Sequence, residues 1–233
     1  MDTRKTVSRQ EWLAARKEFL QQEKEFTRQR DALSAARQAL PRVKVEQNYS
    51  FESADGPTTL AELFDGRSQL IVQHFMFGSD WEEGCPSCSF WADGYDGFIC
   101  HLNARDISMV AVSNAPLDKL HDYRRRMGWS FPWVSSMGTS FNSDFAVSFT
   151  EEELSTDEPN YNFGTQRFGM PEAPGMSVFE KEEDGAVFHT YSAYSRGLDM
   201  FNAAYHYMDS VPKGRDEGEL PHPMAWLRRH DSY

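Results

Sequence analysis

The chain has 233 residues, of which 39% are hydrophobic and 26% charged, so it can bury the core of one α/β domain with additions and needs no disulfides to fold. A net charge of −12 argues against nucleic-acid binding, because phosphate recognition depends on concentrated Lys and Arg. Three cysteines are too few for a disulfide scaffold, and no apolar stretch has the length of a membrane span or the form of a signal peptide. These features favour a cytoplasmic protein with no membrane partner.

A long helix is predicted in an N-terminal extension, residues 1–42. Ser8 and Glu11 have the spacing of a capping box, and neither Gly nor Pro follows until Pro41. The large apolar residues of this segment recur every seven positions: Trp12, Phe19, Phe26, Leu33 and Leu40. Such a stripe is expected to pack on the chain's own domain or on a second subunit, which would make a homodimer.

Residues 43–212 are expected to form an α/β domain. The apolar run 70–77 is typical of a central strand covered on both faces, and Pro86 suits the first position of a helix. The other predicted elements are a single helix over 86–103, strands at 107–112 and 131–134, a helix at 117–127, a hairpin of 176–180 with 186–191, and a helix at 198–208. Alternating strands and helices favour parallel pairing with right-handed crossovers.

Two segments lack steady periodicity. Residues 139–173 are predicted to be a long surface loop insertion with exposed aromatic side chains, including Tyr161 and Phe163. Residues 213–233 form a polar, proline-punctuated C-terminal tail.

The candidate reactive site is Cys85-Pro86-Ser87-Cys88, at the change from strand to helix. Two cysteines at this spacing can close a disulfide across the first helical turn. Cys85 is expected to be the nucleophile, because backbone N–H groups at a helix start stabilise a thiolate, and Cys88 is expected to resolve the mixed disulfide. A purely structural pair remains an alternative.

The surrounding residues qualify this chemistry. Asp80, Glu82 and Glu83 would raise the pKa of a thiol toward which they point. Cys100, twelve residues after Cys88, is expected to be a buried structural thiol. No metal site is expected, because zinc normally needs four ligands and the sequence has no second such cysteine pair; His74 and His101 are expected to be partly buried and hydrogen-bonded.

Three stretches together make the chain recognisable: 69–77 with 84–90, 127–136 and 190–199. They resemble the uncharacterised, mainly bacterial thioredoxin-like proteins grouped as domain of unknown function family 899, with a distant likeness to thioredoxin and to AhpC/TSA-type peroxiredoxins. The resemblance implies a thioredoxin-like α/β fold, in which a central mixed sheet is flanked by helices and extended by a long N-terminal helix and a long loop insertion.

The resemblance also implies further site residues. Thioredoxin-like proteins commonly place a cis-proline opposite the active cysteines, and Pro174 stands at that position, with Pro171 as its competitor. Together with Trp81 and Pro86, Pro174 is expected to bind the substrate.

The expected function is a thiol–disulfide oxidoreductase that acts on a thiol or disulfide substrate, including a protein one, and needs no cofactor beyond the Cys85/Cys88 disulfide. One alternative is a peroxiredoxin-like thiol peroxidase with Arg196 as the cation of its site, although the motif Pro-x-x-x-Thr-x-x-Cys is absent. The other is a non-catalytic binding module that holds a partner with Tyr161 and Phe163.

Overall fold

The computed structural model describes residues 5–233, which divide at Pro41/Arg42 into two compact units. The first unit contains one helix, α1 (Arg9–Gln38). Ser8 caps it as predicted: its hydroxyl accepts from the N–H of Glu11, and the Glu11 carboxylate accepts from the N–H of Ser8 at 2.9 Å. None of the helices in the described residues is both long and apolar enough to cross a bilayer.

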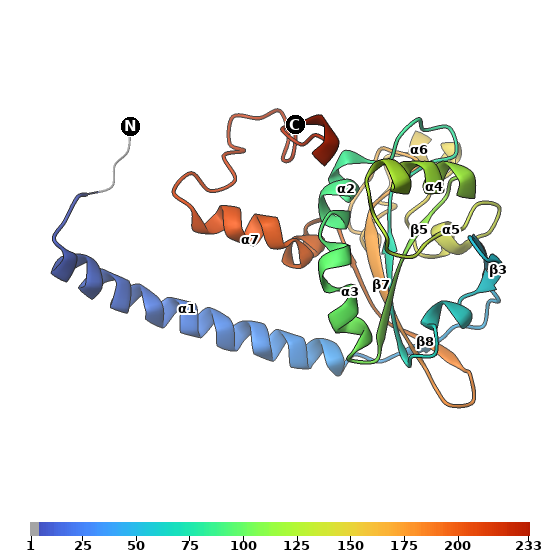
Figure 1. Ribbon diagram of the computed structural model, residues 1–233, viewed down its shortest axis with the longest axis horizontal. Coiled ribbons are helices and arrows are strands. Elements are labelled where there is room, and N and C mark those ends of the chain that lie inside the picture. Colours follow the sequence, from blue (N-terminus) through green and yellow to red (C-terminus); the bar gives the residue numbers. More distant parts are fainter. Residues whose placement is uncertain (1–4) are drawn as a thin grey trace. The chain divides into compact units, whose positions relative to one another are not determined.

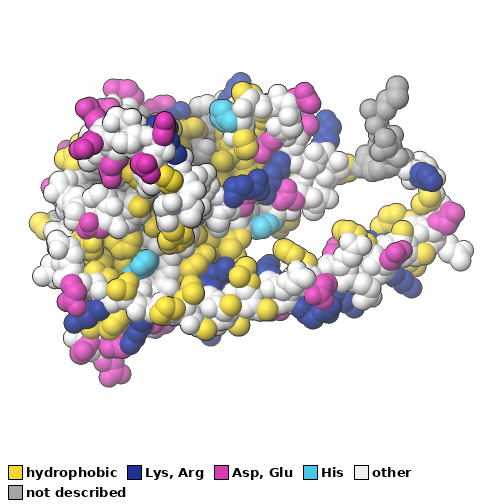
Figure 2. All heavy atoms as spheres, turned by 180° about the vertical axis from the view of Figure 1, so that it is seen from behind, with side chains coloured by type: hydrophobic (Ala, Val, Ile, Leu, Met, Phe, Trp, Pro, Cys, Tyr) yellow, Lys and Arg dark blue, Asp and Glu magenta, His cyan; other side chains and the backbone are white. Residues whose placement is uncertain are grey.

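Four of the five large members of the apolar stripe lie on α1, Leu40 follows just after its end, and none of the helix's side chains is buried. Its five large members are 46–66% exposed, and Figure 2 shows hydrophobic side chains at intervals along this helix. Packing of the stripe on the chain's own domain or on a second subunit stays a prediction.

Phe19→Asp is expected to lower the melting temperature or to shift the sedimentation coefficient, because burial of a phenylalanine contributes roughly 2–3 kcal/mol that a charge would cancel. Gln21→Asp adds the same charge about 200° further round the helix and is the control. If both variants melt and sediment like the wild type, the stripe has no packing role.

The second unit is built on an eight-stranded sheet of order β1-β8-β7-β4-β5-β6-β2-β3. The strands are β1 (Val43–Lys44), β2 (Ser50–Ser53), β3 (Gly56–Thr59), β4 (Gln69–His74), β5 (Ile107–Ser113), β6 (Trp133–Ser135), β7 (Gly175–Lys181) and β8 (Val187–Tyr194). β4, β5 and β6 pair in parallel, whereas β7 runs antiparallel to both β4 and β8. This mixed sheet, with a parallel βαβ half and a terminal hairpin, is the thioredoxin-like fold that the sequence predicted (Figure 1).

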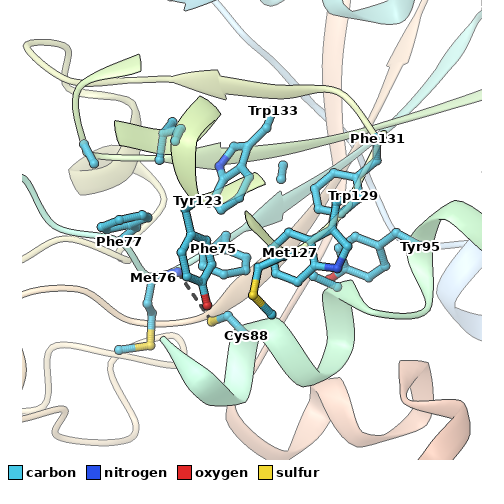
Figure 3. Close-up of a cluster of buried hydrophobic side chains, with 14 of the residues drawn as sticks. Phe75, Met76, Phe77, Cys88, Tyr95, Tyr123, Met127, Trp129, Phe131 and Trp133 are labelled. Atoms are coloured by element: carbon cyan, nitrogen blue, oxygen red, sulfur yellow. Dashed lines mark hydrogen bonds between the residues drawn. The ribbon is translucent and has the colours of Figure 1, made fainter. Parts of the chain in front are cut away.

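The helices of this unit are α2 (Pro86–Ala92), α3 (Tyr95–Asn103), α4 (Leu117–Arg126), α5 (Phe141–Asp144), α6 (Glu151–Ser155) and α7 (Ala203–Ser210), with 3-10 turns η1 (Glu62–Phe64), η2 (Ser195–Phe201) and η3 (His230–Ser232). One sheet face packs against α2, α3 and α4 around an aromatic cluster that includes Phe75, Tyr123, Trp129 and Trp133 (Figure 3). The other face packs against η1 and α5. The CxxC segment therefore starts on the aromatic face.

The predicted helix over 86–103 is wrong in one respect, because it breaks between α2 and α3 and restarts after Gly94. Tyr95 then sets the buried face of α3, and Ile99 packs beside it. Cys100, five positions after Tyr95, lies about 140° away from that face. It is exposed, so the prediction of a buried thiol is also wrong.

Segment 139–173 was predicted to be a surface loop, but it contributes to the core. α5 brings Phe141 onto the second sheet face, and Val147 and Tyr161 belong to a third buried cluster. Tyr161 is 1% exposed, so the expectation of an exposed ring holds only for Phe163, at 71%. Single buried anchors separated by turns leave no periodic pattern in a sequence.

His74 lies at the end of β4 and is fully enclosed, at 1% exposure. Its Nε2 is 2.8 Å from Ser177 Oγ, which is itself 2.8 Å from Ser192 Oγ. Burial lowers the pKa of His74 to about 3. The histidine is therefore neutral in the folded protein at any pH near neutrality.

This histidine is expected to make the protein less stable in acid. The unfolded chain takes up a proton near pH 6.5 and the folded one only near pH 3, so stability falls as the pH drops through this window, by about 3 kcal/mol at pH 4. Urea unfolding at pH 7 and pH 4 measures the loss, and His74→Gln should reduce it by about 3 kcal/mol, whereas the share from carboxyl groups with lowered pKa values, such as Glu83 and Asp231, should remain. An undiminished loss in that variant would assign the effect to another group.

Candidate functional site

Cys85 is the N-cap of α2, and Pro86 stands at the first helical position, where its missing N–H is not needed. The N–H of Cys85 donates to the carbonyl of Met76 at 3.1 Å. The N–H and the hydroxyl of Ser89 both donate to the carbonyl of Cys85, at 3.0 and 2.9 Å. These bonds fix the backbone of Cys85 between the end of the β4 segment and the first turn of α2.

Gly84 allows the loop that precedes Cys85 to approach the aromatic cluster. A Cβ atom at this position would come within 2.8 Å of the rings of Phe75 and Tyr123. Any larger residue would push the segment before Cys85 away from the sheet.

The two thiols differ in environment. Both are free, Cys85 is half-buried and Cys88 is buried. The sulfur of Cys88 accepts the N–H of Met76 at 3.4 Å, as the dashed line in Figure 3 marks. Cys88 therefore lies inside the turn and Cys85 at its open end.

Their pKa values are driven apart. Hydrogen bonds from the Cys88 thiol and from the N–H groups of Cys88 and Ser87 lower the pKa of Cys85 to about 7, against the effect of burial. The same hydrogen bond, together with burial, raises the pKa of Cys88 well above its ordinary value. Near neutral pH, the Cys88 thiol therefore donates a hydrogen bond to the Cys85 thiolate at the start of α2.

The acidic residues before Cys85 do not have the expected effect. Glu83 forms ion pairs with Arg126 and, at 2.6 Å, with Arg229. Neither it nor Asp80 nor Glu82 is among the causes of the Cys85 shift, which is downward. The sequence showed the carboxylates but not the arginines that neutralise Glu83 from 43 and 146 positions away.

The C-terminal segment packs beside the same loop. Arg229 donates to the carbonyl of Gly84 at 2.8 Å and to the hydroxyl of Tyr123 at 3.0 Å. Asp231 pairs with Arg126 at 2.7 Å. The segment is thus anchored directly before Cys85, a role that no spacing in the sequence indicates.

A cavity of about 290 Å³ opens beside the pair. Ser87, Cys88 and Trp91 line it from α2, and Tyr161 and Phe168 line it from the 139–173 segment. Leu198, Tyr205 and Met224 complete most of the apolar wall. The sequence could have indicated that Trp91 lies near Cys88, because it follows Cys88 by three positions and shares its helix face. It held no such signal for the cavity residues of the other segments.

The predicted substrate-binding residues do not all meet here. Pro174 lines the cavity together with Cys88, and its carbonyl accepts the hydroxyl of Tyr161. No peptide bond within residues 5–233 is cis, so the cis-proline implied by the resemblance is instead trans. Trp81 and Pro86 do not line the cavity; Trp81 packs against the aromatic cluster. Nor do any three His, Cys, Asp or Glu side chains of the described chain gather as metal ligands.

The chain is similar to three solved structures. They are the peroxidoxin BcpB from Mycobacterium tuberculosis (15% identity, 70% of this chain and 94% of that one, TM-score 0.47), PrxQ from Xylella fastidiosa (10%, 71% and 94%, 0.46) and peroxiredoxin Q from Xanthomonas campestris (14%, 70% and 94%, 0.44). At these identities and scores, their activities do not transfer to this chain.

No curated protein matches the sequence. A family model does, over residues 1–233, and its description is "Bacterial protein of unknown function (DUF899)". The chain therefore belongs to the DUF899 family, which the sequence resemblance had indicated.

Proposed function

We propose that the protein is a thiol–disulfide oxidoreductase whose reactive dithiol is Cys85 and Cys88. The observation that carries this proposal is the placement of two free thiols in the first turn of α2, with Cys85 half-buried at the N-cap and Cys88 buried three residues later. The opposite displacement of their pKa values supports it. A pKa of about 7 makes about half of Cys85 thiolate at neutral pH, which suits a nucleophile.

The reaction begins when the Cys85 thiolate attacks one sulfur of a substrate disulfide. The substrate S–S bond breaks, its other sulfur leaves as a thiolate that takes a proton from water, and a mixed disulfide remains. Cys88 then loses its proton and attacks Cys85, which releases the second substrate thiol and closes the Cys85–Cys88 disulfide. The substrate gains two electrons and the protein loses them, so no cofactor is required.

The structure suggests why Cys88 waits for the second step. Its pKa is raised in part by the hydrogen bond to Cys85 and by the negative charge of Cys85. Formation of the mixed disulfide removes that charge, so the pKa of Cys88 falls when its thiolate is needed. Burial keeps it from attacking outside disulfides before then.

The test is reversible formation of the internal disulfide. After mild oxidation, the peptide that contains Cys85 and Cys88 should lose two hydrogens, and a reductant should restore them. Cys100→Ser is the control, because the change must survive removal of the exposed third thiol. Failure to find the mass difference in this peptide would refute a redox-active pair.

The peroxidase alternative would produce the same disulfide by another route. Peroxide would oxidise the Cys85 thiolate to a sulfenic acid with release of an alcohol or water, and Cys88 would condense with it to release water. Arg196, the cation proposed for that site, pairs with Asp199 at 2.9 Å and is largely exposed. Comparison of the oxidation rates with hydrogen peroxide and with a disulfide decides between the two reactions. Equal inertness toward both would instead favour the non-catalytic binding module.

A further inference from the structure

The cavity beside Cys88 is walled mainly by apolar and aromatic side chains. Trp91, Phe168 and Tyr205 contribute rings from three segments that are far apart in the sequence. Phe90 and Trp91 each meet Tyr205 edge to face, at 5.3 and 5.8 Å between ring centroids, so the wall continues into a packed aromatic layer. Such a wall favours an apolar ligand.

The charged side chains that line the cavity are already paired. Asp199 accepts from Arg196 and from Arg215, each at 2.9 Å, and Arg215 also binds Asp209. Glu217 accepts three hydrogen bonds from its own segment and α7: from Trp226 at 2.7 Å, Met224 at 3.0 Å and Tyr205 at 3.0 Å. The charges on this wall therefore largely compensate one another within the protein, and a neutral ligand can bind without breaking these pairs.

The C-terminal segment limits what can enter. Pro223 and Met224 line one side of the cavity. Further along the same segment, Arg229 donates to the carbonyl of Gly84 and so anchors the segment beside the CxxC loop. The volume of 290 Å³ lies at the lower end of the roughly 300–1,000 Å³ of small-molecule sites. A stable protein partner normally covers roughly 800 Å² of each surface, far more than this cavity offers.

We infer that the dithiol acts on a small, neutral disulfide with an aromatic or otherwise apolar body, and that one half of this molecule occupies the cavity. The inference rests on the proposed function and adds its substrate class. Cys88 lines the cavity and Cys85 stands three residues before it at the start of the same helix, so a molecule with one half in the cavity brings its sulfur–sulfur bond to this turn. Attack, resolution and release of two substrate thiols then proceed as described above, with the same balance of electrons and protons.

The experiment uses the reduced full chain with Cys100→Ser, so that only the pair reacts. Its rate of oxidation is measured with three disulfides: 4,4′-dithiodipyridine, which is neutral and aromatic, 5,5′-dithiobis(2-nitrobenzoate), which is aromatic and anionic, and 2-hydroxyethyl disulfide, which is neutral and polar. Each rate is divided by that of dithiothreitol with the same compound, which removes differences in intrinsic reactivity. Reduction of insulin, which is followed by the turbidity of the precipitated product, tests whether the pair reacts with a protein disulfide.

The normalised rate should be highest for 4,4′-dithiodipyridine, by about tenfold, because burial of one ring contributes roughly that factor or more. Phe168→Ala should reduce this preference, while Phe98→Ala, which removes a ring of α3 outside the cavity, should preserve it. Equal normalised rates for all three compounds, or a faster reaction with insulin, would overturn the assignment of substrate class.

A redox-inert analogue separates this inference from the proposed function. 1,2-Di(4-pyridyl)ethane has the two rings of the aromatic disulfide joined by carbon, and calorimetry should show its saturable binding, weakened by Phe168→Ala. Binding together with a dithiol that no disulfide oxidises would refute the oxidoreductase and leave an apolar ligand site. A reactive dithiol without binding or preference would refute only the substrate class.

Discussion

Cys88→Ser is expected to stop the reaction at a mixed disulfide on Cys85, and Cys85→Ser is expected to slow capture of the probe strongly. With 4,4′-dithiodipyridine in the Cys100→Ser background, the intact pair should release two equivalents of pyridinethione, because resolution expels the second half of the probe. Cys88→Ser should release one equivalent and retain the other half as a covalent adduct, which intact mass spectrometry detects.

The Cys85→Ser variant should react at least about fiftyfold more slowly at pH 7, because a thiol of pKa about 9 or more is about 1% ionised or less there, against about half for Cys85. The raised pKa of Cys88 and its burial both act in this direction. The substitution removes the Cys85 thiolate, so part of that rise disappears and burial must protect Cys88. If the two variants trap the probe equally fast, the assignment of nucleophile and resolving thiol is wrong.

The sheet could be predicted because its signals are local. The run 70–77 is apolar and rich in strand formers, and β4 occupies its first part, Gln69–His74. Residues 75–77 leave the strand but remain buried, because Phe75 and Phe77 turn into the aromatic cluster. Periodicity detected burial correctly but could not show where the ladder ends.

The cysteine pair could also be predicted from a local signal, whereas the residues that surround it could not. The pair and Pro86 lie within four consecutive residues, so spacing alone places them at the start of a helix. The cavity wall instead draws on segments near 91, 168, 198 and 224, which only the folded chain brings together. The same limit explains the acidic residues: Glu83 is adjacent to Cys85 in sequence, but its charge is offset by Arg126 and Arg229.

The pH at which Cys85 becomes reactive tests the electrostatics of the site most directly. In the Cys100→Ser background, alkylation of Cys85 by iodoacetamide should rise with pH and reach half of its maximum near pH 7, since only the thiolate reacts. If Asp80, Glu82 or Glu83 pointed toward the thiol, its half-point would lie higher than this, because a nearby carboxylate raises the pKa of a thiol. A half-point at or above about pH 9 would therefore contradict the lowered pKa of Cys85.

Two substitutions at Cys88 show whether its hydrogen bond causes the shift. Cys88→Ala removes the donor that is the largest cause of the lowered pKa, so the half-point of Cys85 should move upward. The first unit of that rise slows alkylation at pH 7 by about fivefold through the lost thiolate fraction, and a second unit slows it by about a further tenfold. Cys88→Ser retains a hydroxyl donor at the same place and should keep the half-point close to pH 7. If both variants keep the wild-type profile, the N–H groups of Ser87 and residue 88 and the hydroxyl of Ser87 lower the pKa, and the Cys88 thiol has no part in activating Cys85.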